Sequence, residues 1–578
     1  MDSSTGLFAA LTRWSHRALI LWLSLFTLAL SLPGLSSIQV IDRDEARYAQ
    51  ASVQMVESGD YVNIRFQDQD RHKKPVGIYW AQSLSLAMFS EKGERKIWAH
   101  RLVSVLAGML AVWGTYWAGL SLYDRRYAFI AAISLSVTLL FVFESHIAKT
   151  DAAICASAAW IIGAIIRLRR QGHVARQHYY SWILWCALGI AILIKGPIIP
   201  MVLGMSLIFI SIGDKISVRH LSWMWRVFNP LGIILFGVIV IPWFVMIYKE
   251  TGGAFFSAAF GGDLAPKLSG AQEQHGGWPG YYLLTIWVSL WPICIFLPLA
   301  CAYGFRRVKS APHSPIAFLM AWIVPFWIML ELIPTKLPHY VLPLFPALVL
   351  LITAVFASLS FERPYRVSRR IGVALFLITS LALVFIVMAA EILYGAGRIW
   401  LFIPVTLAVL TTLYAVLNLS WHDIETEQLE SGFISVSLTG LILSTLTYGF
   451  IMPNLTELRL ADRLKGNLEI QNIALPREGG PLIRSPHFSE PSLIYNLGGT
   501  ILLGAKADDY TRHPLTKGQI TLIDLTRKDG LERVGALDGV AKLNGLCLKD
   551  RGRVDGLNYS KGDEVKLSLF QIETCPEE

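Results

Sequence analysis

Long apolar segments recur through the first 451 residues of this 578-residue chain, and they constrain its fold more than any other feature. A helix that crosses the hydrocarbon core of a membrane needs roughly 20 mostly apolar residues. The chain is 54% hydrophobic and only 16% charged, which is too apolar for an ordinary soluble protein. We therefore predict an α-helical polytopic membrane protein with about 13 transmembrane helices. The predicted spans lie near residues 18–38, 97–120, 127–143, 152–167, 181–194, 197–212, 228–248, 280–302, 316–333, 339–357, 371–393, 399–418 and 432–451.

The distribution of positive charge predicts how these spans are oriented. Lys and Arg are concentrated in alternate short loops, whereas the intervening loops hold few cations. Excess Lys and Arg is typical of short cytoplasmic loops. The pattern places the N-terminus in the cytoplasm, and it places residues 40–96, residues 249–279 and the tail on the opposite side. The net charge of +9 is spread over these patches without forming one basic face, so membrane lipid is the expected partner and nucleic acid is not.

The tail, residues 454–578, differs in composition from the rest of the chain. It is polar, rich in Gly and Pro, and contains short alternating or β-branched runs. We predict a transmembrane catalytic domain at residues 1–453 and a small soluble α/β or mainly β domain at residues 454–578, in which we find no catalytic motif. Cys547 and Cys575 lie in this tail, where an oxidising compartment would allow them to pair, although their spacing alone does not establish a bond.

Residues 40–80 hold the densest group of ionisable side chains before residue 453. Residues 42–44 have the Asp-x-Asp spacing that holds a metal against phosphate in some sugar transferases, but residues 68–70 have it too, so metal binding stays open. Apolar residues at helical spacing in residues 46–56 predict an amphipathic helix along the membrane surface. A charged exterior loop is commonly a solvated surface. The position of this loop beside a membrane span favours the alternative, a catalytic loop.

Further ionisable residues recur at span ends on the same side of the membrane. Such groups commonly line a substrate path, although a Lys at a helix end also reaches the lipid headgroups. Separate cations suit a lipid phosphate and carboxylates suit the hydroxyl or amino groups of a sugar, so a lipid-linked phosphosugar needs both. The sequence has no nucleotide-binding P-loop, zinc-protease or Rossmann motif. The residues at the span ends are Glu144, His146, Lys149, Asp151, Lys195, Lys267, His275, Lys336, His339 and Tyr340.

Several short motifs carry a resemblance to a known family. They are Asp-Glu-Ala-Arg-Tyr-Ala at residues 44–49, Met-Val-Glu-Ser-Gly-Asp at 55–60, Lys-Pro at 74–75, Tyr-Trp at 79–80, Thr-Asp at 150–151, Lys-Gly-Pro at 195–197 and Lys-Leu-Pro-His-Tyr-Val-Leu-Pro at 336–343. With them, roughly residues 15–450 resemble the bacterial aminoarabinose lipid A transferases, which are related to the protein O-mannosyltransferases. The resemblance implies a GT-C type glycosyltransferase fold and a polyprenyl-phosphate-linked sugar donor.

The resemblance also implies roles for individual residues. Asp44 is the expected key carboxylate, supported by Glu45, and Lys74 is expected to hold the phosphate of undecaprenyl phosphate. Asp151 is the expected second carboxylate near the sugar. Lys73 stands where some relatives carry an acid, which leaves open any metal held through that acid. The other expected contacts are Arg47, Lys195 and Lys267 (where an Arg is expected) to the phosphate, and Tyr48, Tyr79, Lys336, Tyr340 and His275 to the sugar or acceptor.

The expected reaction moves 4-amino-4-deoxy-L-arabinose from undecaprenyl phosphate to the phosphates of lipid A, with inversion at the anomeric carbon. Because the attacking phosphate is already ionised, the reaction needs positioning and charge stabilisation more than a general base, and it requires no cofactor. The resemblance implies a monomer in the bacterial inner membrane that acts on the periplasmic face. Two alternatives stay open: a related transferase with another acceptor, such as a protein hydroxyl, and a lipid or solute transporter.

Overall fold

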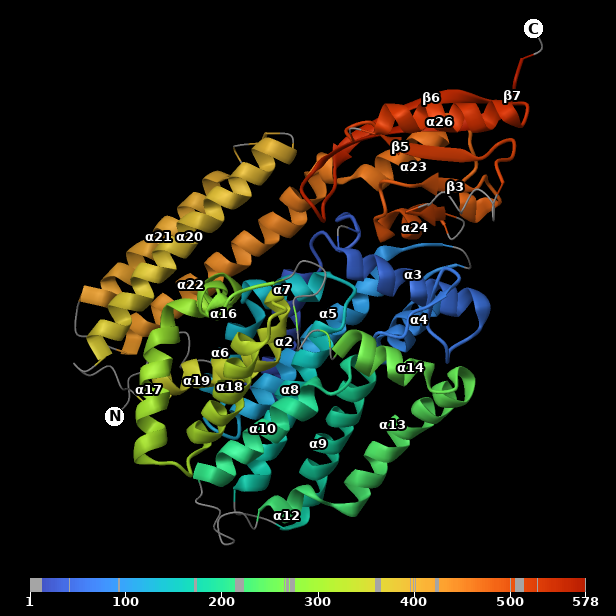
Figure 1. Cartoon of the computed structure of the whole chain (residues 1–578). Helices are drawn as coiled ribbons and strands as arrows, with labels where there is room; N and C mark the ends of the chain where they lie inside the picture. Colours follow the sequence, from blue (N-terminus) through green and yellow to red (C-terminus); the bar gives the residue numbers. More distant parts are fainter. Residues whose placement is uncertain are drawn as a thin grey trace.

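The structure is a computed structural model in which helices form most of the chain up to residue 470 and a mixed sheet follows (Figure 1). It describes residues 13–40, 42–91, 94–170, 174–213, 223–264, 266, 270, 276–358, 365–395, 397–398, 400, 402–421, 426–498, 501–504, 514–527 and 529–576.

Every predicted span overlaps helical structure. Within the described residues, eight helices are long and apolar enough to cross a membrane, and the pair α6 (Arg125–Ser136) and α7 (Leu139–His146), bent by 62°, makes a ninth. α2 (His16–Ser31) and α10 (Ile198–Gly213) are apolar but shorter. The other helices at predicted spans are α5 (Ile97–Gly119), α8 (Asp151–Arg169), α9 (Val174–Lys195), α13 (Pro230–Thr251), α18 (Pro315–Leu332), α19 (Phe345–Ala357), α20 (Arg366–Tyr394), α21 (Phe402–Trp421) and α22 (Thr426–Leu446).

Two further predicted spans are interrupted by 3-10 segments. The span at residues 280–302 divides into α16 (Tyr281–Ser289) and α17 (Leu297–Ser310), with a 3-10 turn, η2 (Ile293–Phe296), between them. The span at residues 339–357 begins as a 3-10 helix, η3 (Pro338–Leu344), and continues as α19. Prolines lie at both breaks, and proline cannot donate the backbone hydrogen bond that continues a helix. Non-helical backbone at membrane depth is tolerated where it is buried or lines a cavity.

α8 is one of the most buried membrane helices and packs against α5, α9 and α19. Of its 19 residues, 15 are buried, and many are Ala or Gly, which allow close approach of neighbouring helices. Gly163, for example, faces the ring of Trp117 so closely that a Cβ atom there would lie 2.5 Å from it. By contrast, α20, α21 and α22 lie side by side at one side of the bundle (Figure 1).

The predicted first exterior loop folds into a compact unit of two helices and a short hairpin. Asp42 caps the first helix because its Oδ1 accepts a hydrogen bond from the Glu45 N–H at 2.8 Å. Gly59 ends this helix with a φ of 75°, in the left-handed region that favours glycine. The elements are α3 (Arg43–Ser58), β1 (Arg65–Phe66), β2 (Gln69–Asp70) and α4 (Gly77–Phe89).

The C-terminal domain is a five-stranded mixed sheet with helices, so an α/β domain forms here. The strand order is β4-β3-β5-β7-β6, in which β4, β3 and β5 run parallel and β7 and β6 pair antiparallel. The hydrophobic cluster here is separate from that of the membrane helices, while the predicted boundary after residue 453 stays a prediction. The elements are α23 (Leu460–Ile470), β3 (Ile483–Ser485), α24 (Pro491–Leu497), β4 (Ile501–Leu503), β5 (Ile520–Asp524), α26 (Gly530–Leu543), β6 (Leu546–Leu557) and β7 (Glu564–Thr574).

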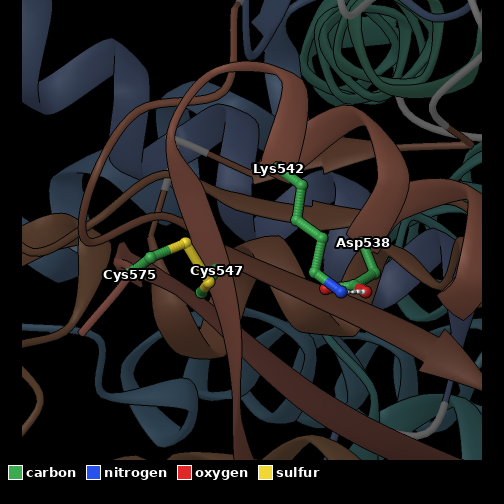
Figure 2. Close-up of a disulfide and its surroundings, with 4 residues drawn as sticks. All are labelled: Asp538, Lys542, Cys547 and Cys575. Carbon is green, nitrogen blue, oxygen red and sulfur yellow. Dashed lines mark ion pairs between the residues drawn. A yellow bond between two sulfur atoms is a disulfide. The ribbon is translucent and has the colours of Figure 1, made fainter. Parts of the chain in front are cut away.

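A disulfide between Cys547 and Cys575 joins the start of β6 to the residue that follows β7 (Figure 2). The sequence left this bond open, and the pairing of β6 with β7 explains it, because their register brings Cys547 opposite Glu573. The two Cα atoms are 4.9 Å apart, within the usual range for a disulfide. The bond therefore closes the end of the hairpin that lies away from its turn.

The C-terminal domain rests on the first exterior loop, with α24 beside α3 (Figure 1). The apolar face of α3, which includes Ala46 and Val53, packs against Tyr495. Arg43 Nε lies 3.1 Å from Glu490 Oε2, and the Glu490 side chain is only 1% exposed. The predicted amphipathic helix therefore forms, but its apolar face is covered by protein where we expected a membrane surface.

Candidate active site

A cavity of about 900 Å³ lies where the first loop, the membrane helices and the C-terminal domain meet. Part of its described lining is charged. The cations outnumber the carboxylates, which favours an anionic ligand. The cations are Arg43, Arg47, Arg71, Lys73, Lys74, Lys149 and Lys561, and the carboxylates are Asp42, Asp44 and Glu144.

The other part of the lining is apolar and comes from α7, α16, α20 and α22. Apolar walls with a few polar groups are typical of small-molecule sites, and helices that contact a membrane suit hydrocarbon chains. The cavity therefore matches an amphiphile with a phosphate headgroup. The apolar side chains are Leu139, Leu140, Phe143, Val288, Leu383, Val387 and Leu443.

Asp44 lies in the first turn of α3 and lines the cavity, with 47% of its side chain exposed. Its Oδ1 is 3.5 Å from Arg47 Nη1 and 3.8 Å from Arg71 Nη2. Burial raises the pKa of this carboxyl, but the charges of Lys149, Arg71 and Arg47 outweigh burial and hold the pKa well below its usual range. Asp44 is therefore ionised at neutral pH and surrounded by an excess of positive charge.

Arg71 lines the cavity beside Asp44, and sequence reasoning missed it. Its Nε donates a hydrogen bond to the Tyr79 hydroxyl at 3.2 Å, and its guanidinium lies 5.3 Å from the ring centre of Tyr48. Burial lowers the pKa of Arg71, but Tyr79, Tyr48 and Asp44 raise it further, so Arg71 keeps its charge. Tyr48 itself lines the cavity, whereas Tyr79 lies outside its described lining and holds Arg71 through this hydrogen bond. The feature of the sequence that could have identified Arg71 is the run of basic residues that begins at Arg71 and ends at Lys74.

Lys149 connects two further carboxylates of the cavity. Its Nζ lies 3.5 Å from Asp42 Oδ2 and 3.7 Å from Glu144 Oε1. His339 Nδ1 lies 3.7 Å from the same Glu144 oxygen. Burial lowers the pKa of Lys149, but Glu144, Asp42, Asp151 and Asp44 raise it well above its usual value, so Lys149 stays protonated. Asp42, the first residue of the Asp-x-Asp, is thus part of the lining of the cavity.

The predicted phosphate ligand Lys74 lies in the turn between β2 and α4, next to Lys73. Both lysines line the cavity, as does Arg47. Two other predicted contacts, Lys267 and His275, lie outside the described residues.

Asp151, Lys195 and Tyr340 meet one another, but the described lining of the cavity does not include them. Lys195 Nζ donates a hydrogen bond to Asp151 Oδ1, and the same ammonium lies 5.8 Å from the ring centre of Tyr340. Asp151 and Lys195 are 2% and 8% exposed, so the pair is buried behind the wall of the cavity. The predicted direct contacts of these residues stay predictions.

Glu45 and Lys336 are each engaged with other groups of the protein. Glu45 forms a bidentate ion pair with Arg101, in which Nε donates to Oε1 at 2.8 Å and Nη2 donates to Oε2 at 2.9 Å. Glu45 Oε1 also accepts a hydrogen bond from the Ala148 N–H. Glu45 is thus held within the protein, and its predicted catalytic role stays a prediction. Lys336 Nζ donates to the carbonyls of Leu330 and Glu331 at the end of α18, so it caps that helix.

The tip of the β6–β7 hairpin also lines the cavity, through Tyr559, Ser560 and Lys561. Ser560 Oγ donates a hydrogen bond to Glu490 Oε1 at 2.6 Å, and the other oxygen of Glu490 pairs with Arg43 at the start of α3. The C-terminal domain therefore closes part of the site, which its sequence did not indicate, since it contains no recognisable motif.

A metal site is not evident in the part of the chain that the structure describes, where no three His, Cys, Asp or Glu side chains converge. The Asp-x-Asp at residues 42–44 directs its two carboxylates to different cations. Asp42 contacts Lys149, and Asp44 contacts Arg47 and Arg71. Ion pairs within the protein thus account for these two carboxylates.

Sequence comparisons relate parts of the chain to sugar transferases. Residues 73–245 match the dolichyl-phosphate-mannose-protein mannosyltransferase family. The chain is 26% identical over 337 residues to the undecaprenyl phosphate-alpha-4-amino-4-deoxy-L-arabinose arabinosyl transferase of Yersinia pestis (strain Pestoides F), and 27% identical to that of Yersinia enterocolitica. These matches cover 57% of this chain and 58% of each relative, so the chain spans a little over half the length of the curated relatives that it matches.

A comparison with solved structures extends the likeness to almost the whole chain. ArnT from Cupriavidus metallidurans bound to undecaprenyl phosphate has a TM-score of 0.71 at 18% identity, covering 96% of this chain and 98% of that chain. The same protein in the apo state has a TM-score of 0.67, also at 18% identity, covering 96% and 99%. The comparisons confirm the resemblance drawn from the sequence, and they show that this polytopic membrane protein has the GT-C glycosyltransferase fold of ArnT, C-terminal domain included.

Proposed function

We propose that this protein is a glycosyltransferase that moves 4-amino-4-deoxy-L-arabinose from undecaprenyl phosphate to the phosphates of lipid A. The names of its relatives and the undecaprenyl phosphate bound to ArnT support this reading. One observation in this chain carries it: the ionised Asp44 lies among cations in a cavity whose other walls are apolar. A polyprenyl phosphate with a sugar attached needs both kinds of surface.

The transfer replaces one sugar–phosphate bond with another. An oxygen of the lipid A phosphate forms a bond to the anomeric carbon while the bond from that carbon to the undecaprenyl phosphate oxygen breaks, and the electron pair leaves with the carrier phosphate. The acceptor phosphate loses one negative charge and the carrier phosphate gains one, so no proton has to move. Positioning and charge stabilisation are therefore the tasks of the protein.

Cations near the leaving phosphate stabilise the charge that develops there. Lys74 and Arg71 suit this role because both line the cavity, and Arg71 is held in place by the Tyr79 hydroxyl. Arg47, one turn along α3 from Asp44, adds to the positive field. These residues are the proposed carrier-phosphate ligands of this chain.

Asp44 is a poor general base, because a carboxylate whose pKa is held low has little affinity for a proton. Its proposed role is to orient the sugar by accepting hydrogen bonds from it and to stabilise positive charge at the anomeric carbon. Asp151 with Lys195, and Glu45 with Arg101, hold the surrounding backbone in place. They act as positioning residues in this proposal.

The proposed setting is the bacterial inner membrane, with the N-terminus in the cytoplasm and the cavity on the periplasmic side. The concentration of Lys and Arg in alternate loops supports this orientation. The disulfide in the C-terminal domain also supports it, because disulfides persist in the oxidising periplasm. The proposed working unit is a monomer.

The deciding experiment is mass spectrometry of lipid A after incubation with purified protein and undecaprenyl phosphate aminoarabinose. We expect the mass of lipid A to increase by one or two aminoarabinose groups, and we expect undecaprenyl phosphate to be released in equal amount. Unmodified lipid A, with a protein that is folded and binds the carrier, would overturn the proposal.

A second candidate is transfer of a sugar to a protein hydroxyl. The match of residues 73–245 to the mannosyltransferase family favours it. A hydroxyl acceptor needs a general base, and the low pKa of Asp44 argues against one at that position. Incubation with a mannosyl donor and Ser/Thr-rich peptides distinguishes the two, because this candidate requires labelled peptide and the main proposal does not.

A further inference from the structure

Glu144 differs from the other carboxylates of the cavity in how completely it is buried and how poorly it is paired. It lies in α7, lines the cavity, and is only 1% exposed. Its Oε1 has Lys149 and His339 at 3.7 Å, beyond hydrogen-bond distance. Its Oε2 is buried and has no hydrogen-bond partner among the described residues. A buried carboxylate oxygen without a partner is costly, so a ligand that supplies a donor would bind favourably.

The charges around Glu144 favour a cationic donor. Lys149 is shared between Glu144 and Asp42, so one positive charge faces two negative ones. Asp44, on the other hand, is already compensated by Arg47 and Arg71. Glu144 therefore has no cation of its own, at a place where the lining changes from the charged residues to the apolar Leu140 and Phe143 of the same helix.

We propose that Glu144 recognises the amino group of the donor sugar and so determines specificity for an amino sugar over its hydroxyl counterpart. This inference rests on the proposed function and deepens it. An ammonium group on the sugar donates a charge-assisted hydrogen bond to the free Glu144 Oε2 and balances the local charge. A sugar hydroxyl at the same carbon supplies a hydrogen bond but no charge, so it binds less tightly.

The test compares two donors in the wild type and in Glu144→Gln. The donors are undecaprenyl phosphate aminoarabinose and undecaprenyl phosphate arabinose, which carries a hydroxyl in place of the amino group. We expect the substitution to lower kcat/KM for the amino donor by between about tenfold and a hundredfold, because a hydrogen bond to a charged group is lost. We expect kcat/KM for the hydroxyl donor to change by less than about twofold, since it does not depend on the charge.

Glu391→Gln is the matched control, because Glu391 is a buried carboxylate in α20 that the described lining of the cavity does not include. It should leave the preference between the two donors unchanged. Glu144→Asp should restore part of that preference, because it restores the charge. Equal loss with both donors in Glu144→Gln would assign Glu144 a structural role and overturn the inference, as would an unchanged preference.

Donor binding without acceptor separates this inference from the proposed function. If the wild type binds both donors but modifies no lipid A, the proposed function fails. The ratio of the two dissociation constants, in the wild type and in Glu144→Gln, then still decides the role of Glu144. A ratio that is the same in both proteins overturns it.

Discussion

Asp44 and Glu144 are two carboxylates of one cavity with opposite electrostatic surroundings. Asp44 is half exposed and has two guanidinium groups within 4 Å, so positive charge dominates around it. Glu144 is buried and shares a single lysine with Asp42, so it lacks a cation of its own. In the proposed function these two surroundings have different tasks: those of Asp44 receive phosphate, and those of Glu144 receive the amino group of the sugar.

The largest effect should come from Asp44→Asn, which removes the charge from the more positive of the two regions. We expect transfer to fall about a thousandfold, because a carboxylate that stabilises the reacting sugar is lost. The protein should remain folded and should still bind undecaprenyl phosphate, since the cations of the region remain. Initial rates with saturating lipid A, together with carrier binding, measure both.

Asp68→Asn is the matched control for this experiment, because Asp68 begins the second Asp-x-Asp of the first loop and is exposed. It should leave the rate within about twofold of the wild type, as expected for a surface substitution. If Asp44→Asn behaves like Asp68→Asn, the division between the two carboxylates is wrong, and the cations around Asp44 serve another purpose.

A smaller effect, on stability, should come from Glu45→Gln. Glu45 and Arg101 are both 1% exposed, and Arg101 also donates hydrogen bonds to the carbonyls of Leu35, Ile38 and Gln39. Breaking the pair leaves a buried guanidinium without its counter-ion, so we expect the free energy of unfolding to fall by about 3 kcal/mol. Thermal unfolding in detergent provides the measurement, read as a fall in Tm.

The control for Glu45→Gln is Glu57→Gln, near the other end of α3. Glu57 pairs with Arg95 at 3.8 Å but is 41% exposed, so its loss should cost less than about 1 kcal/mol. Equal changes in Tm for the two variants would show that the buried pair does not hold α3. Loss of transfer in Glu45→Gln without loss of stability would instead return Glu45 to the catalytic group.

The sequence indicated which residues belong to the candidate site where neighbouring residues along the chain form a recognisable motif. It did not indicate which side chains pair with one another when the pairing depends on the packing of distant helices. Asp44 and Lys74 could be found because the first loop is dense in charge and carries recognisable motifs. Lys195 and Lys336 have the same local signature, a lysine at a span end, yet one pairs with Asp151 and the other caps α18. Which of these occurs depends on the packing of helices far apart in sequence.

Other parts of the site have no local signal at all. Tyr559 to Lys561 reach the cavity only because the β6–β7 hairpin is long and the C-terminal domain docks on α3. The approximate positions of the apolar segments could be predicted from hydropathy, whereas about 13 spans were predicted and eight or nine helices of the described residues are long and apolar enough to cross a membrane. The breaks at η2 and η3 could be located only by their prolines, and their relation to the cavity required the structure.

Lys149→Gln should affect both regions, because Lys149 contacts Asp42 and Glu144 and also lowers the pKa of Asp44. We expect transfer to fall about a hundredfold, as for removal of one preorganised charge from an active site. Unlike Glu144→Gln, it should affect the amino and hydroxyl donors alike. The control is Lys96→Gln, since Lys96 pairs with Glu94 outside the described lining. A selective loss with only one donor would show that the two regions act independently.

The smallest expected effect concerns pH, and it separates the protein's charges from those of its substrates. The folded-state pKa of Asp44 lies below its unfolded value, so the stability from its ion pairs is complete above about pH 4 and is lost only as the pH falls through the lower value. The pKa of Lys149 is raised, so it too keeps its charge through neutral pH. The ion pairs of these two groups should therefore contribute equally to donor affinity at pH 5 and at pH 8. The acceptor phosphate is a monoester whose second ionisation lies near pH 6, so kcat/KM for lipid A should rise about tenfold from pH 5 to pH 7.

Parallel measurement of donor binding and acceptor turnover over this range checks both statements. A donor affinity that titrates together with turnover would show that a group of the protein, and not the acceptor phosphate, controls the reaction.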